Sequence, residues 1–178
     1  MSQHKVASPN MREHLSIEIL QNGHLWSIVN HQQTGVILQK KYYAEYIGPG
    51  AAIGGPFDPE CISIHVLGAV EYEIPKTDEM RFSAFQNRIK NIEQLKEICE
   101  ISSPLNRGIA ILVMFSQQFS LEEIQRIPNN LLAMLVGVAP STITAAWKQF
   151  LANQRNAEVP PSVQSTGMLL NNVVSFYG

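Results

Sequence analysis

The sequence predicts an α+β chain with a β-rich N-terminal half, a connecting helix and a helical C-terminal half. Three observations support this order. Short runs of alternating or β-branched residues, separated by glycine-containing turns, fill roughly the first 75 residues. A helical repeat of apolar residues begins after Pro75. The stretch NNLLAMLVGVAPSTITAAWKQ, residues 129–149, has the pattern of a helix-turn-helix.

The N-terminal half has the pattern of an all-β unit. After a polar tail over residues 1–13, the runs LSIEIL, LWSIVN and GVILQ are strand-like, and Asn22-Gly23 supplies one of the turns. The segment YAEYIGPGAAIGGPF contains Gly-Pro-Gly and Gly-Gly-Pro clusters that interrupt regular structure. CISIHVLGAVEYEIP then predicts two strands about Gly68. We therefore expect a jelly-roll-like β-roll over residues 1–76.

A helix is expected over residues 77–102 as a connecting or dimerisation element. Thr77 is suited to the N-cap, and the two acidic residues that follow it favour the positive end of the helix dipole. Apolar residues then recur at helical spacing. They are Phe82, Phe85, Ile89, Ile92, Leu95 and Cys99. Packing of this stripe against the β-roll is the alternative to a dimer interface, because no long heptad pattern is sustained after Ile92.

Residues 103–178 are predicted to form the helix-turn-helix domain. Ser103-Pro104 starts a helix, and SLEE at residues 120–123 has the spacing of a capping box. QRNAEVPPS follows the motif as a proline-containing linker, and VVSFY near the end is a candidate terminal strand, as a wing would require.

The motif itself has the packing residues that two crossing helices need. Gly137 occupies the corner, where a positive φ is least unfavourable for glycine, and Pro140 fits the first turn of the second helix. The residues expected to be buried are Leu132, Ala133, Val136, Val138, Ile143, Ala146, Trp147 and Phe150. The opposite face of the second helix is available to the major groove. Its expected DNA contacts are Pro140, Ser141, Thr142, Thr144, Lys148 and Gln149, with Thr142 and Lys148 on phosphates.

Composition narrows the class of protein. The chain has 178 residues, of which 45% are hydrophobic, enough for a substantial core. No apolar run approaches a membrane span and no signal-peptide pattern occurs, so we expect a cytoplasmic protein that binds no membrane. The two cysteines match no metal or redox spacing and are interpreted as small buried hydrophobes. A net charge of −2 with 13 basic residues requires local clustering of positive charge for nucleic-acid binding.

The order of these parts resembles the Crp/Fnr family of bacterial transcription regulators. YIGPGAAIGGPF and HVLGAVEYEIPKTDEMRF are similar to the family's cyclic-nucleotide-binding-like β-roll, and NNLLAMLVGVAPSTITAAWKQF is similar to its DNA-binding motif. The two stretches cover about residues 40 to 150. The resemblance implies a winged helix-turn-helix, a homodimer, and binding to double-stranded DNA in regulation of transcription.

The sequence departs from the cyclic-nucleotide-binding members of this family. In those members a Gly-Glu pair holds the ribose and a downstream arginine holds the phosphate. Here Gly55 stands in place of the glutamate, and no arginine occurs between Arg12 and Arg81. A buried phosphate would lack charge-assisted hydrogen bonds, so we expect no response to cyclic nucleotide. Two cysteines cannot hold a four-cysteine iron–sulfur cluster, and we predict no cofactor and no metal.

The second helix of the motif departs as well. Family members commonly carry Arg and Glu early in this helix and another Arg one turn later, whereas Pro140, Ser141 and Ala145 stand there in this chain. No arginine is therefore present to form the commonest contact to guanine, and specificity is expected to be modest or to rest on DNA shape.

Other interpretations remain open at this stage. The helix-turn-helix pattern also suits an ordinary helix-packing unit, a protein-interaction module that contacts a protein partner, or a small-molecule sensor that uses the β-roll. His24, His31 and His65 are expected on strands, with hydrogen-bonding rather than ligand roles. The glycine clusters are suited to anion binding or to turns alone. No catalytic arrangement is recognisable, and we predict no enzymatic activity.

Overall fold

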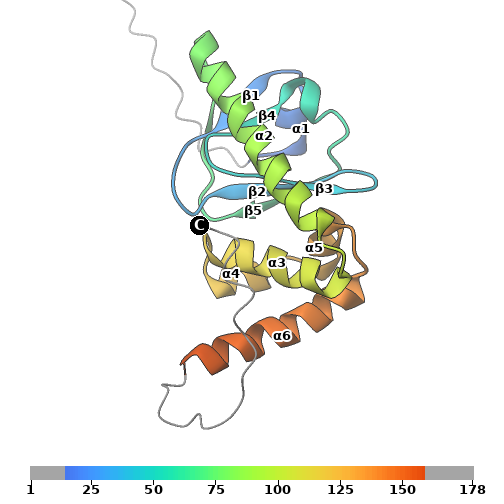
Figure 1. The fold of residues 1–178 in the computed structure, drawn as a ribbon. Helices are drawn as coiled ribbons and strands as arrows, with labels where there is room; N and C mark the ends of the chain where they lie inside the picture. Colours follow the sequence, from blue (N-terminus) through green and yellow to red (C-terminus); the bar gives the residue numbers. More distant parts are fainter. Residues whose placement is uncertain (1–14, 159–178) are drawn as a thin grey trace, which may run out of the picture.

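The computed structural model describes residues 15–158 as a mixed α+β protein (Figure 1). The strands come first and the long helices follow, as the sequence predicts. The polar tail over residues 1–13 and the terminal strand VVSFY lie outside the described residues. The first helix α1, the strands β1–β6 and the short 3₁₀ helix η1 are called the strand unit below, and α3–α6 the helical unit.

The strands form two three-stranded antiparallel sheets. The first sheet has the order β4-β1-β6 and the second the order β3-β2-β5. Among the residues that the structure describes, these sheets do not close into a barrel. The bounds are β1 Leu25–Ile28, β2 Gly35–Gln39, β3 Ala44–Ile47, β4 Ala52–Gly54, β5 Ser63–Leu67 and β6 Tyr72–Glu73, with η1 at Gly55–Phe57.

One core lies between the two sheets. It contains Leu20, Ile28, Val36, Leu38, Ile47, Ala51, Ile53 and Cys61. Leu20 comes from α1, Ile17–Gln21, where the sequence predicted a strand. That prediction was wrong because Ser16 caps a short helix by accepting a hydrogen bond from the Ile19 N–H at 3.4 Å. The helix places Leu20 in the core, fully buried, which outweighs the preference of the isoleucines for strand.

The glycine-rich segment contains more regular structure than its sequence predicts. β3 and β4 flank the Gly-Pro-Gly turn, and Gly50 within it has a φ of 71°. The two strands predicted about Gly68 are confirmed as β5 and β6. Gly68 has a φ of 67°, and a Cβ there would lie 2.0 Å from the Gln33 carbonyl oxygen. No larger residue fits this turn.

The predicted helix starts are confirmed. Thr77, Ser103 and Ser120 each accept a hydrogen bond from the backbone of the following turn, and Ser120 forms a full capping box with Glu123. The linker predicted from Gln154 is wrong in its first residues, because the last helix continues through them. The bounds are α2 Asp78–Glu100, α3 Pro104–Ser116, α4 Leu121–Gln125, α5 Asn129–Val136 and α6 Pro140–Glu158.

A second core joins the two units. The second sheet turns Ile37, Tyr46 and Leu67 toward the helical unit, while Val36 and Leu38 face the core between the sheets. The Tyr46 ring packs edge-on against Phe115 with centroids 5.2 Å apart. Strand β2 is thus buried on both faces. The helical unit packs directly against the strand unit through this core (Figure 1).

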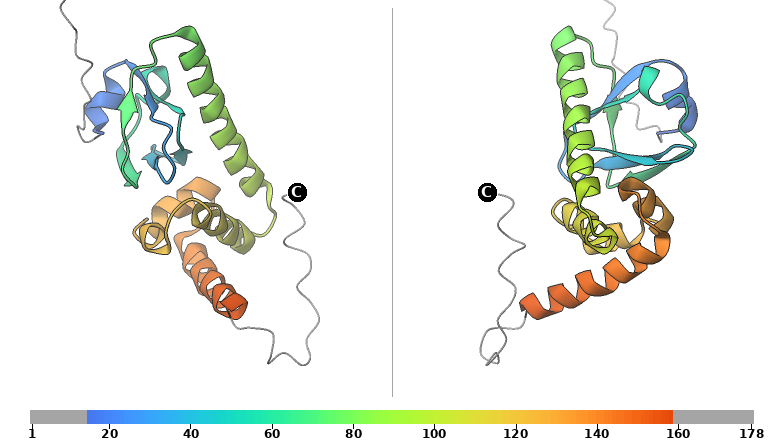
Figure 2. Two further views of the ribbon diagram at one scale, coloured as in Figure 1. Left: turned by 90° about the vertical axis from the view of Figure 1, so that its left-hand side faces the viewer. Right: turned by 45° about the vertical axis from the view of Figure 1, so that its right-hand side comes forward.

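Helix α2 runs along one side of the strand unit and ends at the helical unit (Figure 2). Helix α6 lies at the end of the molecule opposite the strand unit in both views. Within the helical unit α3 and α6 cross very closely, because Gly108 has no side chain. A Cβ at Gly108 would lie 2.8 Å from the Ala146 Cβ. The contact between Gly108 and Ala146 sets how closely α6 packs on α3.

Substitution of Gly108 should therefore destabilise the fold. Gly108→Val overpacks the α3–α6 crossing, and we expect a loss of about 1–3 kcal/mol in the free energy of unfolding, measured by urea denaturation. Asn106→Val, at an exposed site of α3, is the control and should change it by less than about 0.5 kcal/mol. Equal losses at the two sites would contradict the close crossing.

Candidate nucleic-acid interface

Helices α5 and α6 have the geometry of a helix-turn-helix. They meet at 99°, within the range of about 90–120° found for such motifs. Gly137 ends α5 in the left-handed conformation, with φ 61° and ψ 47°, as predicted. The N–H groups of Gly137 and Val138 both donate to the Ala133 carbonyl, which closes the helix end.

Six of the eight residues predicted to pack the motif are buried, and Val138 and Trp147 are half-buried against the same core. Ile143 and Ala146 of α6 and Leu132 and Val136 of α5 are fully inaccessible, and Phe150 is 5% exposed. No single helix among residues 15–158 is long and apolar enough to span a membrane. The pair α5 and α6 reaches that length and composition only when joined, and its apolar residues belong to the core between the two units.

The face of α6 predicted to contact DNA is turned outward. Pro140, Ser141, Lys148 and Gln149 are exposed, and Thr142 is half-buried. Their positions agree with a surface that a groove could reach, and none of them contributes to the cores. Lys148 and Arg155 are the cations of the described helix α6, so the positive charge is sparse.

Thr144 is exposed, but its hydroxyl already has two partners. It accepts a hydrogen bond from the Asn129 side-chain amide at 3.2 Å and donates to the Pro140 carbonyl at 3.3 Å. The DNA contact predicted for Thr144 would have to replace or share these bonds. In the unbound protein Thr144 therefore ties the start of α5 to the first turn of α6.

Arg107 of α3 supports the motif, and the sequence analysis missed it. Its Nη1 donates to the carbonyl oxygens of Val136 at 3.2 Å and Gly137 at 3.3 Å. The guanidinium donates to carbonyls that the end of α5 leaves unpaired, and its positive charge interacts favourably with the negative end of the helix dipole. The corner of the helix-turn-helix is thus held by α3 as well as by its own glycine.

Helix α2 carries two apolar stripes where the sequence predicted one. Ala84, Leu95 and Ile98 are buried against the rest of the protein. A second stripe consists of Phe82, Phe85, Ile89 and Ile92. Phe82, Ile89 and Ile92 face solvent, whereas Phe85 is half-buried and packs against the Phe57 ring, with centroids 5.5 Å apart. Phe82 is 63% exposed, and Ile89 and Ile92 are 52% and 46% exposed. The spacing of this stripe, 3-4-3, is that of the seam of a coiled coil.

The buried stripe of α2 also contains Arg88, which enters a cluster of charges in the strand unit. We call the four side chains Lys40, Glu45, Asp58 and Arg88 the ionic clasp. Arg88 forms a two-pronged pair with the Asp58 carboxylate, at 2.8 Å and 2.9 Å, and also binds Glu45. Lys40 Nζ lies 2.8 Å from the same carboxylate. Lys40 directly after β2 and Asp58 directly after η1 are thereby joined to Glu45 of β3 and Arg88 of α2.

The clasp is shielded from water and electrically balanced. Asp58 is fully inaccessible, and Lys40 and Arg88 are 2% and 4% exposed. Burial raises the pKa of the Asp58 carboxyl, but the hydrogen bonds and charge of Arg88, together with Lys40, outweigh it, and the pKa lies below its ordinary value. Two cations and two carboxylates sum to zero, so no charge remains for a bound phosphate.

The Gly-Pro-Gly turn is the second attachment point of α2. Asn87 Nδ2 donates to the Gly50 carbonyl at 3.2 Å, and the Gly48 N–H donates to Asn91 Oδ1 at 2.8 Å. A Cβ on Gly50 would lie 2.8 Å from Asn87 Nδ2. Glycine therefore suits this turn because α2 approaches it closely and because Gly50 has a positive φ. The turn needs no bound anion to explain its glycines.

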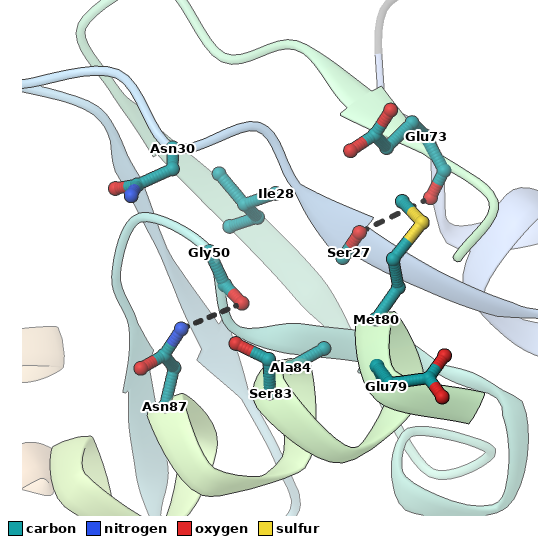
Figure 3. A pocket seen from close by; sticks show the side chains of 10 residues that line it. All are labelled: Ser27, Ile28, Asn30, Gly50, Glu73, Glu79, Met80, Ser83, Ala84 and Asn87. Carbon is teal, nitrogen blue, oxygen red and sulfur yellow. Dashed lines mark hydrogen bonds between the residues drawn. The ribbon is translucent and has the colours of Figure 1, made fainter. Parts of the chain in front are cut away.

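A cleft of about 330 Å³ lies between the start of α2 and the first sheet (Figure 3). The Asn87–Gly50 hydrogen bond closes one side, and Met80 and Ile28 supply apolar surface. The charged residues that line it are Glu73 and Glu79. Two carboxylates and no cation make this cleft unsuited to a phosphate.

The positions of one cysteine and two histidines differ from those predicted. Cys61 is buried as expected, whereas Cys99 is exposed at the end of α2. His65 lies on β5, but His24 and His31 lie in the connections that flank β1. No cluster of three or more potential metal ligands occurs within residues 15–158.

No protein-family model matches the sequence, and no curated protein matches it either. The resemblance to Crp/Fnr regulators therefore depends on the residues and geometry of this chain alone.

The buried Asp58 carboxylate should make stability depend on acid. Its pKa is lower in the folded than in the unfolded chain, so its contribution is present above about pH 4 and is lost as the pH falls through the folded value. We expect Asp58→Asn to lower the free energy of unfolding by about 3–5 kcal/mol at pH 7, with a smaller difference from wild type below pH 4. Urea denaturation across pH provides the measurement.

Asp78→Asn is the matched control, because the Asp78 side chain is 98% exposed. Because Asp78 lies in the first turn of α2, its loss should lower the free energy of unfolding by only about 0.3–1 kcal/mol. A loss for Asp58→Asn that stays constant down to pH 2 would contradict the role given to its carboxylate charge.

Proposed function

We propose that this protein is a DNA-binding transcription regulator of Crp/Fnr type that acts as a homodimer and does not respond to cyclic nucleotide. The observation that carries the proposal is the helix-turn-helix: α5 and α6 meet at 99° about a left-handed glycine, with the predicted contact face exposed. In this proposal the strand unit is a β-roll of the family.

The outer stripe of α2 supports the homodimer. Three of its four apolar side chains, Phe82, Ile89 and Ile92, face solvent at coiled-coil spacing on a helix whose other side is already packed. Two copies of α2 in parallel about a twofold axis would bury this stripe. Since α6 lies at the end of the molecule opposite the strand unit, both copies of α6 would then lie at the same end of the dimer (Figure 2). That is the arrangement that two half-sites on one face of DNA require.

The charges near the strand unit support independence from cyclic nucleotide. The cations that a phosphate would need, Lys40 and Arg88, are paired with carboxylates inside the clasp. The cleft beside α2 is lined by carboxylates instead. A cyclic phosphate would find no unpaired cation in the clasp, and in the cleft it would meet two carboxylates.

The sparse charge of α6 favours a second candidate, a non-enzymatic protein-interaction module with the same fold. Its described cations, Lys148 and Arg155, are few for a surface whose non-specific affinity must come from phosphate contacts. In that case the exposed face of α6 would bind a protein partner. The two candidates differ in whether binding to DNA exists and depends on salt.

DNA binding should be weak, dependent on salt and sensitive to Lys148. Anisotropy titrations of labelled genomic fragments should give affinity that falls with salt concentration. Lys148→Ala should weaken binding to all fragments similarly and reduce the slope of log K against log salt by about 0.9 for each phosphate contact removed. Lys90→Ala, at an exposed lysine of α2, is the control. Absence of binding at low salt would refute the DNA-binding proposal.

The dimer should depend on α2. Ile89→Asp places a charge in the proposed seam, and analytical ultracentrifugation should show at least a tenfold weaker dimer, since about 1.4 kcal/mol corresponds to tenfold. Ile62→Asp is a matched control, because Ile62 on the strand unit is also 52% exposed. A monomeric wild-type protein at micromolar concentration, or equal effects of both substitutions, would contradict the seam.

A further inference from the structure

Four hydrogen-bond donors converge on one carboxylate inside the strand unit. Asp58 Oδ1 accepts from Lys40 Nζ at 2.8 Å and Arg88 Nη2 at 2.9 Å. Asp58 Oδ2 accepts from Arg88 Nη1 at 2.8 Å and from the Gly54 N–H at 2.7 Å. A guanidinium fork, an ammonium and a main-chain N–H are the groups with which proteins bind small anions. The carboxylate is the anion, and the chain itself supplies it.

The backbone around Asp58 is arranged to aim these donors. Gly54 has a φ of 76°, and a Cβ there would lie 2.9 Å from the His24 carbonyl oxygen, so glycine is required where its N–H points at the carboxylate. Lys40 is held in place by a second hydrogen bond, to the Phe57 carbonyl at 2.8 Å. The Phe57 ring covers the guanidinium of Arg88, with its centroid 4.9 Å from Cζ.

The same contacts determine where α2 lies. Arg88 is on the middle of α2, and besides Asp58 it binds the Ala52 carbonyl at 3.2 Å. Without the Asp58 carboxylate, Lys40 and Arg88 would have only the charge of Glu45 between them, so one buried positive charge would be uncompensated and α2 would have to move to solvate it. An anion between Lys40 and Arg88 is thus a condition for the position of α2.

We propose that Asp58 is a built-in ligand: it fills an anion-binding site formed by Lys40, Arg88 and the Gly54 N–H, and holds α2 in place without an external anion. The consequence for regulation depends on the proposed function. A regulator built in this way binds DNA in the absence of any anionic effector at this site.

Removal of the carboxylate should create a dependence on added anion. Asp58→Ala lacks only the carboxylate group, and formate has the size and charge to replace it. We expect sodium formate to raise the melting temperature of Asp58→Ala saturably, by at least about 3 °C more than that of wild type. Sodium chloride at equal ionic strength should not. Asp78→Ala, at the exposed carboxylate of α2, is the control for surface effects of formate.

Equal formate shifts in Asp58→Ala, Asp78→Ala and wild type would overturn the built-in ligand. If Asp58→Ala does not fold in buffer, formate should restore the yield of folded protein on dilution from urea, and unchanged yield would overturn it. A second variant removes one positive charge together with the negative charge of Asp58. Asp58→Asn/Lys40→Met keeps the Arg88–Glu45 pair and no unpaired cation, so it should melt above Asp58→Asn. Equal or lower melting would contradict the account.

Measurements of DNA binding distinguish the built-in ligand proposal from the proposed DNA-binding function. Wild type should bind DNA equally with and without formate, and Asp58→Ala should bind only with formate. Formate-dependent melting in a protein that binds no DNA would sink the proposed function and leave the built-in ligand standing. Full DNA binding by formate-free Asp58→Ala would overturn the regulatory role of Asp58 while leaving the proposed function intact.

Discussion

The buried pair of Arg88 and Asp58 is the interaction on which the position of α2 depends. Breaking a buried ion pair costs about 3–5 kcal/mol, a large part of the stability of a protein of this size. The pair is directional, since two parallel hydrogen bonds fix both the place and the angle of the guanidinium. Apolar packing alone, which is non-directional, would permit α2 to slide or rotate on the strand unit.

The placement of α2 divides its residues between two tasks. Arg88, Asn87 and Asn91 face the strand unit and bind the clasp and the Gly-Pro-Gly turn. In the stripe from Phe82 to Ile92, the side chains of Phe82, Ile89 and Ile92 are consequently turned to solvent, and an exposed apolar area of this kind is typical of an interaction surface. The end of α2 leads directly into α3. Arg107 of α3 binds the end of α5, and Gly108 permits the close packing of α6 on α3. One ionic contact thus bears on both the proposed dimer seam and the proposed DNA-binding face.

The elements that the sequence predicted well are those with local causes. Helix caps at Thr77 and Ser120 and the glycine corner at Gly137 depend on residues within one turn, and their patterns can be recognised directly. The exposed face of α6 was likewise predictable as the side opposite its buried stripe, although the hydrogen bonds of Thr144 were not. The clasp was missed because Asp58 lies 30 residues from Arg88 and 18 from Lys40, and no local spacing brings them together.

The most direct test is the distance between the two copies of α6 in the proposed dimer. A spin label on Ser141→Cys, in a Cys99→Ser background that leaves only the buried Cys61, can report it by pulsed electron paramagnetic resonance. The account predicts a narrow distribution centred near about 34 Å, the separation of successive major grooves on one face of DNA. A broad distribution, or a distance that places the two helices on opposite sides of the dimer, would contradict it.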